Sequence, residues 1–585
     1  MLNRVRYVIP FLAAALVAAG CTSGGSTPAA QNPQKGSAPA SGAANPNSLP
    51  RNETLYTSGA QWGPPANFNP IREWDSAMGA KGLVYETLFH FDPATGKLFP
   101  WLAQSGGWTG DKTYEIKLRP GVKWSDGQPF TAKDVAFTFE LGKMETIPYH
   151  VLWEWLKSVE AVDDQTVKFT FSTANYQEWD FNLFNRAIVP EHLWKDLSEK
   201  DVLNGVNENA VGTGAYKYMS HDQDRVVLER RDDWWGKTAL NMEPKPKYIV
   251  DIVNSSNEVA MGLLLQKGMD LSNNFLPGIA NLVKGNFGIS TYYPDAPYML
   301  SANTTWLVPN TTKKPMNDPA FRKALATAID TKKIVENVYS NIVKASGPTG
   351  MLPQWDQFVD QGVVGQYGFS FDKDKAKKML ADAGYKDTNG DGLVENKDGS
   401  KLSLSLIVPS GWTDWMEASR SIAASAKAAG IDITPDFPDY NALVEKRGKG
   451  DFDLVLNNDR QLSNTPFTYY QFIYQLPIQK TQNTVNFGRY EDKKSWDLVQ
   501  RLDQVKSDDT EGMKKVLAEL QKRQLDQLPV IPLWYNGLWS QVSNSVWKNW
   551  PSSTGNMPKT AAVSWRNWWE MGGFKTLTQL QPAAS

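Results

Sequence analysis

Tryptophan and asparagine recur where predicted strands end, and both residue types can bind a sugar. An indole offers a flat apolar face to the C–H groups of a sugar ring, and an amide can both donate and accept hydrogen bonds. In open α/β sheets, ligands bind beyond the carboxyl ends of the strands. The candidate ligand-binding residues that leave these strand ends are Trp62, Asn303, Trp412, Trp415, Asn457, Asn458, Trp534, Tyr535 and Trp539.

These candidates predict a neutral carbohydrate as the ligand. A site group left unpaired by a wrong ligand would cost about 1–3 kcal/mol, so amides give specificity without charge. The chain has 23 tryptophans, and we expect most of them to fill the core and the interfaces. Packing is therefore the competing interpretation for each candidate indole, and it is the favoured one for Trp565, Trp568 and Trp569.

The sequence lacks the common catalytic and metal-binding motifs. It has no Gly-x-Ser-x-Gly motif, no phosphate-binding loop and no His-Glu-x-x-His motif. Its single cysteine cannot form an internal disulfide, and its four histidines (His90, His150, His192 and His221) share no metal-ligand spacing. We therefore expect no enzyme activity and no cofactor. A secreted glycoside hydrolase is the alternative from another class, since two of the many carboxylates could pair in space.

One acidic loop has the opening of a calcium-binding loop. Asp387, Asn389 and Asp391 hold the first, third and fifth positions, and Gly392 holds the sixth. Asp398 holds position 12, where the usual residue is the longer, bidentate glutamate. A turn-rich hairpin loop explains the same residues. We predict no metal site, with structural calcium in this loop as the alternative.

Length and composition indicate a large globular protein. The 585 residues suffice for several domains or for one interleaved two-lobe body. Hydrophobic residues make up 41% and charged residues 21%, which excludes a disordered chain and a multi-span membrane protein. The formal net charge is −2 and no basic block is present, so a nucleic-acid partner is not expected.

The N-terminus is typical of an exported protein. Residues 1–20 combine Arg4 and Arg6 with a short apolar run and small residues before Cys21, as in a cleaved signal peptide. This ending resembles the bacterial lipoprotein signal, which implies a lipidated, palmitate-bearing Cys21; an ordinary signal with a chance cysteine is the alternative. Residues 21–51 are rich in Ser, Gly, Ala and Pro and predict a flexible tether to the outer face of the membrane.

Strand and helix patterns alternate along the remaining chain, which favours α/β lobes with mixed sheets. Thr131 and Asp134 have the spacing of a capping box, and Asp318 followed by Pro319 begins a helix that we expect to reach about Tyr339. The predicted strands are 53–57, 114–118, 167–171, 402–408, 452–456 and 530–534, and the later helices are 418–429, 494–505 and 512–525.

Three segments together resemble the extracytoplasmic solute-binding proteins of family 5, the peptide, nickel and oligosaccharide receptors of bacterial ABC importers. They are 118–139 (LRPGVKWSDGQPFTAKDVAFTF), 211–216 (VGTGAY) and 317–330 (NDPAFRKALATAID). The resemblance implies a two-lobe, periplasmic-binding-protein-like α/β fold with mixed sheets and a subdomain inserted in the first lobe. It also implies a monomer that closes on its solute and delivers it to the transmembrane subunits of an ABC permease.

By the same resemblance, two crossovers near 299–304 and 530–534 join the lobes. The implied organisation is a signal peptide (1–20), a lipidated tether (21–51), a first lobe (52–300, inserted subdomain about 90–210), a second lobe (301–534) and a return to the first lobe (535–585).

The segment after 452–456 distinguishes two branches of the family. Peptide-binding members hold the free amine of the ligand with an aspartate that precedes a proline; alignment on Pro466 places Leu462 there, although a gap would bring in Asp459. The Asn457-Asn458 pair and the run 463–470 instead resemble the branch that binds β-linked cello- or manno-oligosaccharides. A neutral oligosaccharide is therefore the predicted solute, and an oligopeptide or dipeptide is the alternative.

Overall fold

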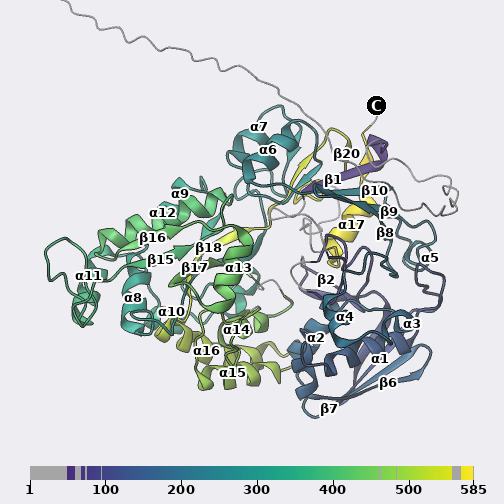
Figure 1. The fold of residues 1–585 in the computed structure, drawn as a ribbon, viewed down its shortest axis with the longest axis horizontal. Coiled ribbons are helices and arrows are strands. Elements are labelled where there is room, and N and C mark those ends of the chain that lie inside the picture. The colour runs from purple at the N-terminus through teal and green to yellow at the C-terminus, as the bar shows by residue number, and fades with distance from the viewer. Residues whose placement is uncertain are drawn as a thin grey trace, which may run out of the picture. The chain divides into compact units, whose positions relative to one another are not determined.

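The computed structural model describes residues 49–58, 67–72, 76–93, 95–459, 463–482, 484–555 and 568–583. The predicted signal peptide, Cys21, most of the tether and Trp62 lie outside these residues. Two large sheets dominate the described part of the chain (Figure 1). None of the helices within the described residues is both long enough and apolar enough to cross a membrane.

The first large sheet combines the beginning of the body with its C-terminal part. Its strand order is β12 (Ile289–Ser290), β19 (Gln541–Ser543), β11 (Leu271–Ser272), β1 (Thr54–Ser58), β10 (Tyr248–Ile252), β9 (Arg225–Arg230) and β8 (Tyr216–His221). β1 pairs in parallel with β10 and β11, whereas the other pairs are antiparallel, so the sheet is mixed. The parallel strands bring their carboxyl ends to one edge.

The second large sheet contains residues from the middle of the chain. Its strand order is β14 (Lys344–Ala345), β18 (Ile531–Gly537), β13 (Ser301–Pro309), β17 (Leu454–Asn457), β15 (Leu404–Ile407) and β16 (Ile433–Asp436). Its helices include α8 (Pro319–Ala328), α9 (Thr331–Asn337), α11 (Lys373–Asp382), α12 (Thr413–Ala428), α13 (Tyr440–Lys449), α14 (Phe467–Tyr474), α15 (Lys493–Asp503) and α16 (Thr510–Gln527) (Figure 1). β15 pairs in parallel with both β16 and β17, and β13 is antiparallel to β17 and β18.

A separate four-stranded antiparallel sheet lies within the predicted inserted subdomain. It consists of β4 (Ala103–Gly110), β5 (Thr113–Leu118), β7 (Thr166–Phe171) and β6 (Leu156–Asp163), with α1 (Ala132–Glu140) and α2 (Tyr176–Asn185). The predicted capping box is confirmed at α1, since Asp134 accepts a hydrogen bond from the Thr131 backbone N–H at 2.8 Å. Trp179 of α2 is fully buried against Phe169 and Phe171.

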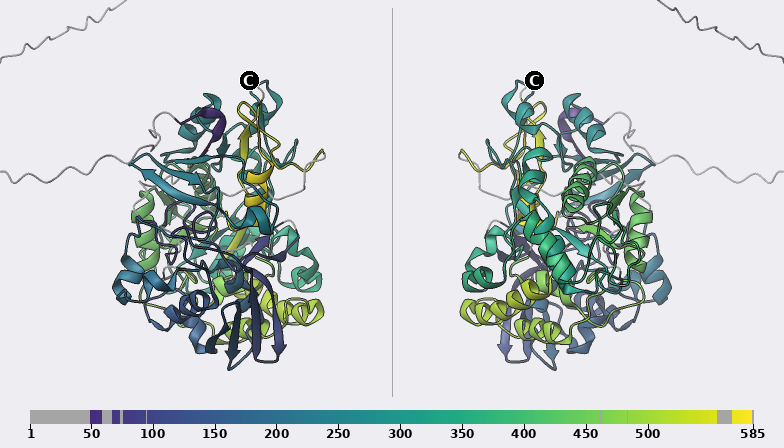
Figure 2. Two further views of the ribbon diagram at one scale, coloured as in Figure 1. Left: turned by 90° about the vertical axis from the view of Figure 1, so that its right-hand side faces the viewer. Right: turned by 90° about the vertical axis from the view of Figure 1, so that its left-hand side faces the viewer.

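The remaining elements lie outside these three sheets. They are β2 (Phe89–Asp92), β3 (Lys97–Pro100), α3 (Glu191–Trp194), α4 (Glu199–Asn204), α5 (Gly236–Ala239), α6 (Asn257–Leu265), α7 (Ile279–Lys284), α10 (Gln361–Tyr367), β20 (Trp547–Lys548), α17 (Met571–Gln579) and β21 (Gln581–Pro582). β2 pairs with β3 and β20 with β21 in two small sheets. Figure 2 shows the yellow α17 among elements of the first half of the chain, and its Phe574 packs against Trp101. Far-separated segments therefore share one core.

Two predicted boundaries differ from the structure. The single helix expected from Pro319 to about Tyr339 is wrong, because α8 ends at Ala328 and the Asp330 carboxylate caps a second helix, α9, through the Lys333 N–H. The boundary expected after Trp534 falls inside β18, which continues to pair with β13 as far as Gly537. The chain returns to the first sheet only at β19.

A buried carboxylate surrounded by tryptophans lies in the hydrophobic core that Trp101 and Phe574 share. Glu86 is fully buried, and its Oε1 accepts hydrogen bonds from the indole N–H groups of Trp101 at 2.9 Å and Trp234 at 3.1 Å. Its Oε2 accepts a third from Trp235 at 2.8 Å. All four side chains come from the first 240 residues, so these indoles are structural.

Candidate functional site

The segments that leave β10 and β15 contact each other and join the two large sheets. The Asn257 amide, just beyond β10, donates to the Asp414 carboxylate at 3.1 Å and to the Thr413 hydroxyl at 3.3 Å. Gly411 has φ +80°, and a Cβ at this position would lie 2.6 Å from the Ser255 carbonyl oxygen. Only glycine permits this approach. The carboxyl ends of strands from both sheets therefore meet here.

A row of asparagines extends this junction along the first sheet. The Asn274 amide donates to Asn254 Oδ1 at 3.2 Å and to Asn257 Oδ1 at 3.4 Å, and all three side chains are buried. The neighbouring Asn273 amide donates to the Trp539 carbonyl oxygen at 2.6 Å. The sequence prediction missed these asparagines, because they follow β10 and the two-residue β11; only their position beside short apolar runs could have indicated them.

Four of the predicted indoles lie in one apolar cluster at this junction. Trp534 packs on Tyr339 with ring centroids 5.3 Å apart, and Phe275 contacts both Tyr339 and Trp539. Trp412 contacts Trp415 at 4.9 Å. All of these rings belong to the same hydrophobic core.

Burial separates the four indoles into two pairs. Trp534 is fully buried and Trp415 is 4% exposed, so both pack as core residues, as the competing interpretation expected. Trp412 and Trp539 are half-buried at the rim of the cluster. These two indoles keep an accessible surface.

The two strands that join the sheets carry a pair of facing asparagines. Asn303 of β13 is the register partner of Asn536 of β18. The amide oxygens of both are buried and accept no hydrogen bond from the described residues. Because side chains alternate along a strand, Tyr535 lies on the opposite face, where its hydroxyl accepts from the Gly347 N–H at 3.2 Å. The predicted Asn303 and Tyr535 are therefore not neighbours in one site, and Asn536 was missed.

The end of β17 is an ion-paired turn. Asp459 accepts a hydrogen bond from Arg447 Nη1 at 2.8 Å and another from the Asn457 amide at 3.1 Å. Asn457 Oδ1 in turn accepts from the Asp459 N–H at 3.0 Å, so both polar atoms of Asn457 are used within the turn. Asn458 is half-buried, and Leu462 lies outside the described residues. The carboxylate nearest the predicted peptide-amine position is already paired with a guanidinium.

Two titratable groups at the junction, Asp414 and Tyr339, have strongly raised pKa values. Burial raises the pKa of the Asp414 carboxyl to about 6. The Tyr339 hydroxyl, in the turn after α9, donates to Asp414 Oδ2 at 3.2 Å, while Asn257 donates from the start of α6, which follows β10 of the first sheet. The pKa of Tyr339 is raised well above its ordinary value by burial and by the Asp414 charge. One carboxylate therefore links segments that lie beside different sheets.

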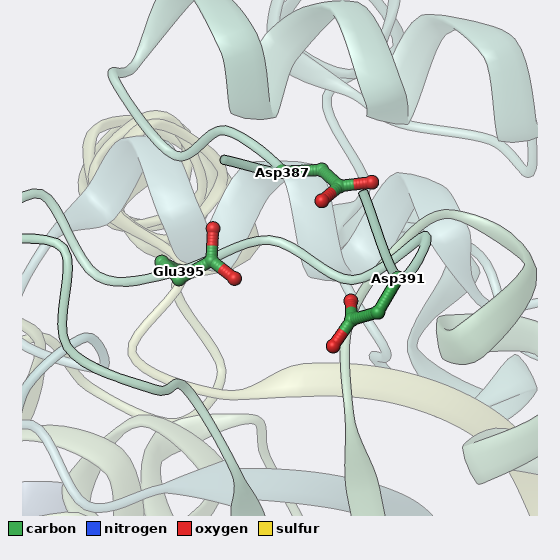
Figure 3. Close-up of side chains that lie close together, drawn as sticks. All are labelled: Asp387, Asp391 and Glu395. Carbon is green, nitrogen blue, oxygen red and sulfur yellow. The ribbon is translucent and has the colours of Figure 1, made fainter. Parts of the chain in front are cut away.

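The acidic loop brings together a different set of residues from the set that was predicted. Carboxylate oxygens of Asp387, Asp391 and Glu395 lie within 4.8 Å of one another (Figure 3). The assignment of Asp398 to this loop is wrong: its carboxylate accepts from the Ser400 N–H and hydroxyl in a separate turn.

Hydrogen bonds within the acidic loop involve Glu395, which replaces Asp398. Its carboxylate accepts from the Thr388 N–H at 2.7 Å and hydroxyl at 2.8 Å, and from the Asn389 amide at 2.8 Å. Asp387 accepts from the N–H groups of Gly390 and Gly392. Hydrogen bonds from the loop's own N–H, hydroxyl and amide groups therefore stabilise its conformation. None of these bonds involves the junction between the sheets.

The family assignment rests on sequence and on structure. The chain matches the family model described as "Bacterial extracellular solute-binding proteins, family 5 Middle" over residues 97–479. Its structure resembles the mannohexaose-bound periplasmic oligopeptide-binding protein of an oligopeptide ABC transporter from Thermotoga maritima, with a TM-score of 0.87 and 41% identity over 92% of this chain and 100% of that chain.

Two curated relatives extend the comparison. The chain is 28% identical to the oligopeptide-binding protein AppA of Bacillus subtilis over 436 residues, 72% of this chain and 76% of the relative. It is 25% identical to the nickel-binding periplasmic protein of Escherichia coli over 414 residues, 66% of this chain and 72% of the relative. The predicted two-lobe α/β fold class is confirmed by the solved structures. The chain belongs to the bacterial extracellular solute-binding proteins of family 5, which serve ABC transporters.

Proposed function

We propose that this protein captures a neutral oligosaccharide between its two lobes and delivers it to the permease of an ABC importer. The observation that carries the proposal is the 41% identity, over 92% of this chain, to a structure that holds mannohexaose. The half-buried Trp412 and Trp539, with Asn303, Asn458 and Asn536, would supply stacking surfaces and neutral hydrogen-bonding groups. β-Linked manno- or cello-oligosaccharides are the expected class.

The charge balance at the end of β17 supports a neutral ligand. A peptide α-amine needs an unpaired carboxylate, whereas Asp459 is paired with Arg447 at 2.8 Å and is only 20% exposed. Freeing this carboxylate would leave a guanidinium that is 9% exposed without a counter-charge, which is costly. A ligand that offers only hydroxyl groups would leave the Asp459–Arg447 ion pair intact.

We propose the lobe boundaries and the membrane anchor from the organisation that the sequence resemblance implies. The first lobe would comprise 52–300 with its inserted subdomain near 90–210 and the C-terminal return, and the second would comprise 301 to the end of β18. Export by residues 1–20, lipidation at Cys21 and the tether 21–51 would hold the body at the outer face of the membrane. A globomycin-sensitive shift in the mass of the mature protein, lost in Cys21→Ser, would test the anchor.

A ligand screen tests the solute. Thermal unfolding is followed with mannohexaose, cellohexaose, a nonapeptide and a dipeptide at matched concentrations, since a ligand that binds the folded state stabilises it by an amount that grows with the logarithm of its excess over Kd. We expect the two hexaoses to raise Tm and the peptides to leave it unchanged. Stabilisation by peptides alone would reject the carbohydrate proposal.

A peptide ligand is the second candidate. It is favoured by the 28% identity to an oligopeptide-binding protein over 72% of the chain. The same screen decides between the two solutes. Recovery of intact hexaose after prolonged incubation tests the glycoside hydrolase alternative, because a receptor returns its ligand unchanged.

A further inference from the structure

A second contact joins the inserted subdomain to the helices of the second sheet, away from the junction described above. It lies between the first turn of α2 and the α14–α16 region (Figure 1). The Gln177 amide donates to the Val505 carbonyl oxygen at 2.7 Å and accepts from the Thr465 hydroxyl at 2.6 Å. The backbone N–H of Glu178 donates to Asp503 Oδ1 at 2.8 Å.

Three carboxylates meet in this contact, and each of them accepts a hydrogen bond from the other side, Asp503 from the Glu178 N–H. Glu178 accepts from the Gln471 amide at 2.7 Å. Asp180 accepts from the Asn464 amide at 3.1 Å and from the Ser507 hydroxyl. Asp503 is 4% exposed. Opening the lobes would remove these donors and return the carboxylates to water.

Burial raises the affinity of all three carboxylates for protons. The pKa of Asp180 rises to about 6, and that of Glu178 is raised. The pKa of Asp503 is raised well above its ordinary value, first by burial and then by the Glu178 charge. Exposed carboxylates titrate near 4.

The other charged and titratable groups at the contact do not balance three negative charges. The Arg186 guanidinium, just after α2, interacts with Glu178, but it is also stacked 3.5 Å over the Tyr149 ring. On the opposite side, Asp508 adds a like charge near Asp180, and Lys506 lies 5.9 Å over the Tyr176 ring. The Asp180 charge also acts on the neighbouring Tyr114 hydroxyl.

We propose that the contact between α2 and the α14–α16 region is a proton-linked latch: closing the lobes buries Asp503 and half-buries Glu178 and Asp180 beside it, so mild acid favours the closed, solute-holding form. The inference rests on the proposed closure of two lobes around a solute. The chain crosses between the two large sheets only near Ser301 and after Gly537, within the described residues, so no covalent connection prevents this contact from opening.

The direction and the size of the pH effect on lobe closure follow from proton linkage. The closed form binds protons more tightly than the open form, so closure becomes more favourable as pH falls. A carboxylate with a pKa near 4 when open and about 6 when closed, as for Asp180, changes the closure constant about tenfold between pH 8 and pH 5. Glu178 and Asp503 act in the same direction.

The test is the affinity of the full chain for mannohexaose, by titration calorimetry at pH 8, 7, 6 and 5 and constant ionic strength. We expect wild-type Kd to fall at least about tenfold from pH 8 to pH 5, with proton uptake on binding. The triple variant Glu178→Gln, Asp180→Asn and Asp503→Asn should lose this dependence. A pH dependence of equal size in wild type and in the triple variant would overturn the proposal.

Two further variants keep the result interpretable. In Asp180→Asn alone, the change in Kd between pH 8 and pH 5 should be about tenfold smaller than in wild type. This single variant tests the proposal even where the triple variant does not fold. Asp497→Asn, on the exposed face of α15, should leave the dependence unchanged. Asp414 stays in every variant, so its own titration cancels in the comparison.

Solution scattering of the ligand-free protein separates this proposal from the proposed function. We expect a smaller radius of gyration at pH 5 than at pH 8 in wild type and no difference in the triple variant. If mannohexaose does not bind but the compaction persists, the carbohydrate assignment fails and the latch stands. If mannohexaose binds and neither Kd nor the radius depends on these three residues, the latch is refuted and the carbohydrate assignment stands.

Discussion

Carboxylates that are shielded from water occur in two different settings in this protein: Glu86 and Asp503 are buried, and Glu178 is half-buried. Glu86 accepts three indole N–H bonds, all from residues of its own core. Glu178 accepts from Gln471, which belongs to the helices of the second sheet, and Asp503 accepts from the Glu178 backbone. The first carboxylate keeps its donors whenever its lobe is folded, whereas the other two keep theirs only while the lobes touch.

The difference shows how the same chemistry serves stability in one place and conformational coupling in another. Removing an acceptor from within a rigid core leaves donors that cannot reach water, and the folded state loses stability. Separating two lobes instead exposes both donors and acceptors to water, so the loss is small and reversible. Aromatic packing follows the same division, with Trp101 and Trp534 fully buried and Trp412 half-buried at the junction.

The largest effect is expected at Glu86. Glu86→Gln keeps one acceptor oxygen but turns an NH₂ group toward an indole N–H, which should lower the unfolding free energy by about 3 kcal/mol. Urea denaturation measures this loss. Glu160→Gln, on the exposed face of β6, should change stability by less than about 0.5 kcal/mol. An unaltered denaturation midpoint in Glu86→Gln would show that the hydrogen bonds between Glu86 and the indoles do not stabilise the fold.

Asp414 combines both settings, since Tyr339 and Asn257 approach it from segments that lie beside different sheets. Its pKa of about 6 when folded exceeds the unfolded value near 4, so its folded form holds the proton more tightly. Its stability contribution is therefore greatest below pH 4, falls between pH 4 and 6, and stays constant above. The expected loss is about 2–3 kcal/mol.

Asp414→Asn should abolish that part of the pH profile. Urea denaturation at pH 4, 5, 6 and 7 compares the variant with wild type, and the difference between the two should shrink by most of this amount as pH rises. A constant difference at all four pH values would show that Asp414 does not titrate in this window.

The helices and strands could be predicted from the sequence more accurately than the contacts that their side chains make. The strand 114–118 is β5, and the helix that begins at Pro319 has the expected Asp318 cap, because local capping and alternation determine both. The prediction failed at Asp330, where a second cap interrupts the helix; the Asp330-Thr331 pair is a start signal that the apolar periodicity concealed.

Site residues were harder to predict for a physical reason. Trp412 and Trp534 were both expected at strand ends, yet Trp534 lies inside β18, where it pairs with β13 and is buried, whereas Trp412 keeps an accessible surface. Asn254 and Asn274 belong to no periodic pattern. Glu395 reaches the acidic loop because a separate turn removes Asp398. None of these outcomes is encoded in a local window of sequence.

The rim of the aromatic cluster gives the next prediction. Trp412→Ala should weaken mannohexaose binding by about 2 kcal/mol, roughly 30-fold, by removing a stacking surface. Trp153→Ala is the matched control, since Trp153 is also half-buried but lies in the inserted subdomain beside Lys143. Calorimetric Kd values equal in both variants would exclude Trp412 from the site.

The smallest effect is expected in the acidic loop, which lacks any hydrogen bond to the junction. Glu395→Gln weakens the bonds from Thr388 and should lower stability by about 1 kcal/mol, with no change in mannohexaose affinity. Melting in EDTA and in millimolar CaCl₂ should then give equal Tm values for wild type. A calcium-induced rise in Tm that disappears in Glu395→Gln, but survives in Asp398→Asn, would contradict this expectation. The three converging carboxylates, rather than the loop's own N–H groups, would then dominate its stability, because a bound cation would offset their mutual repulsion.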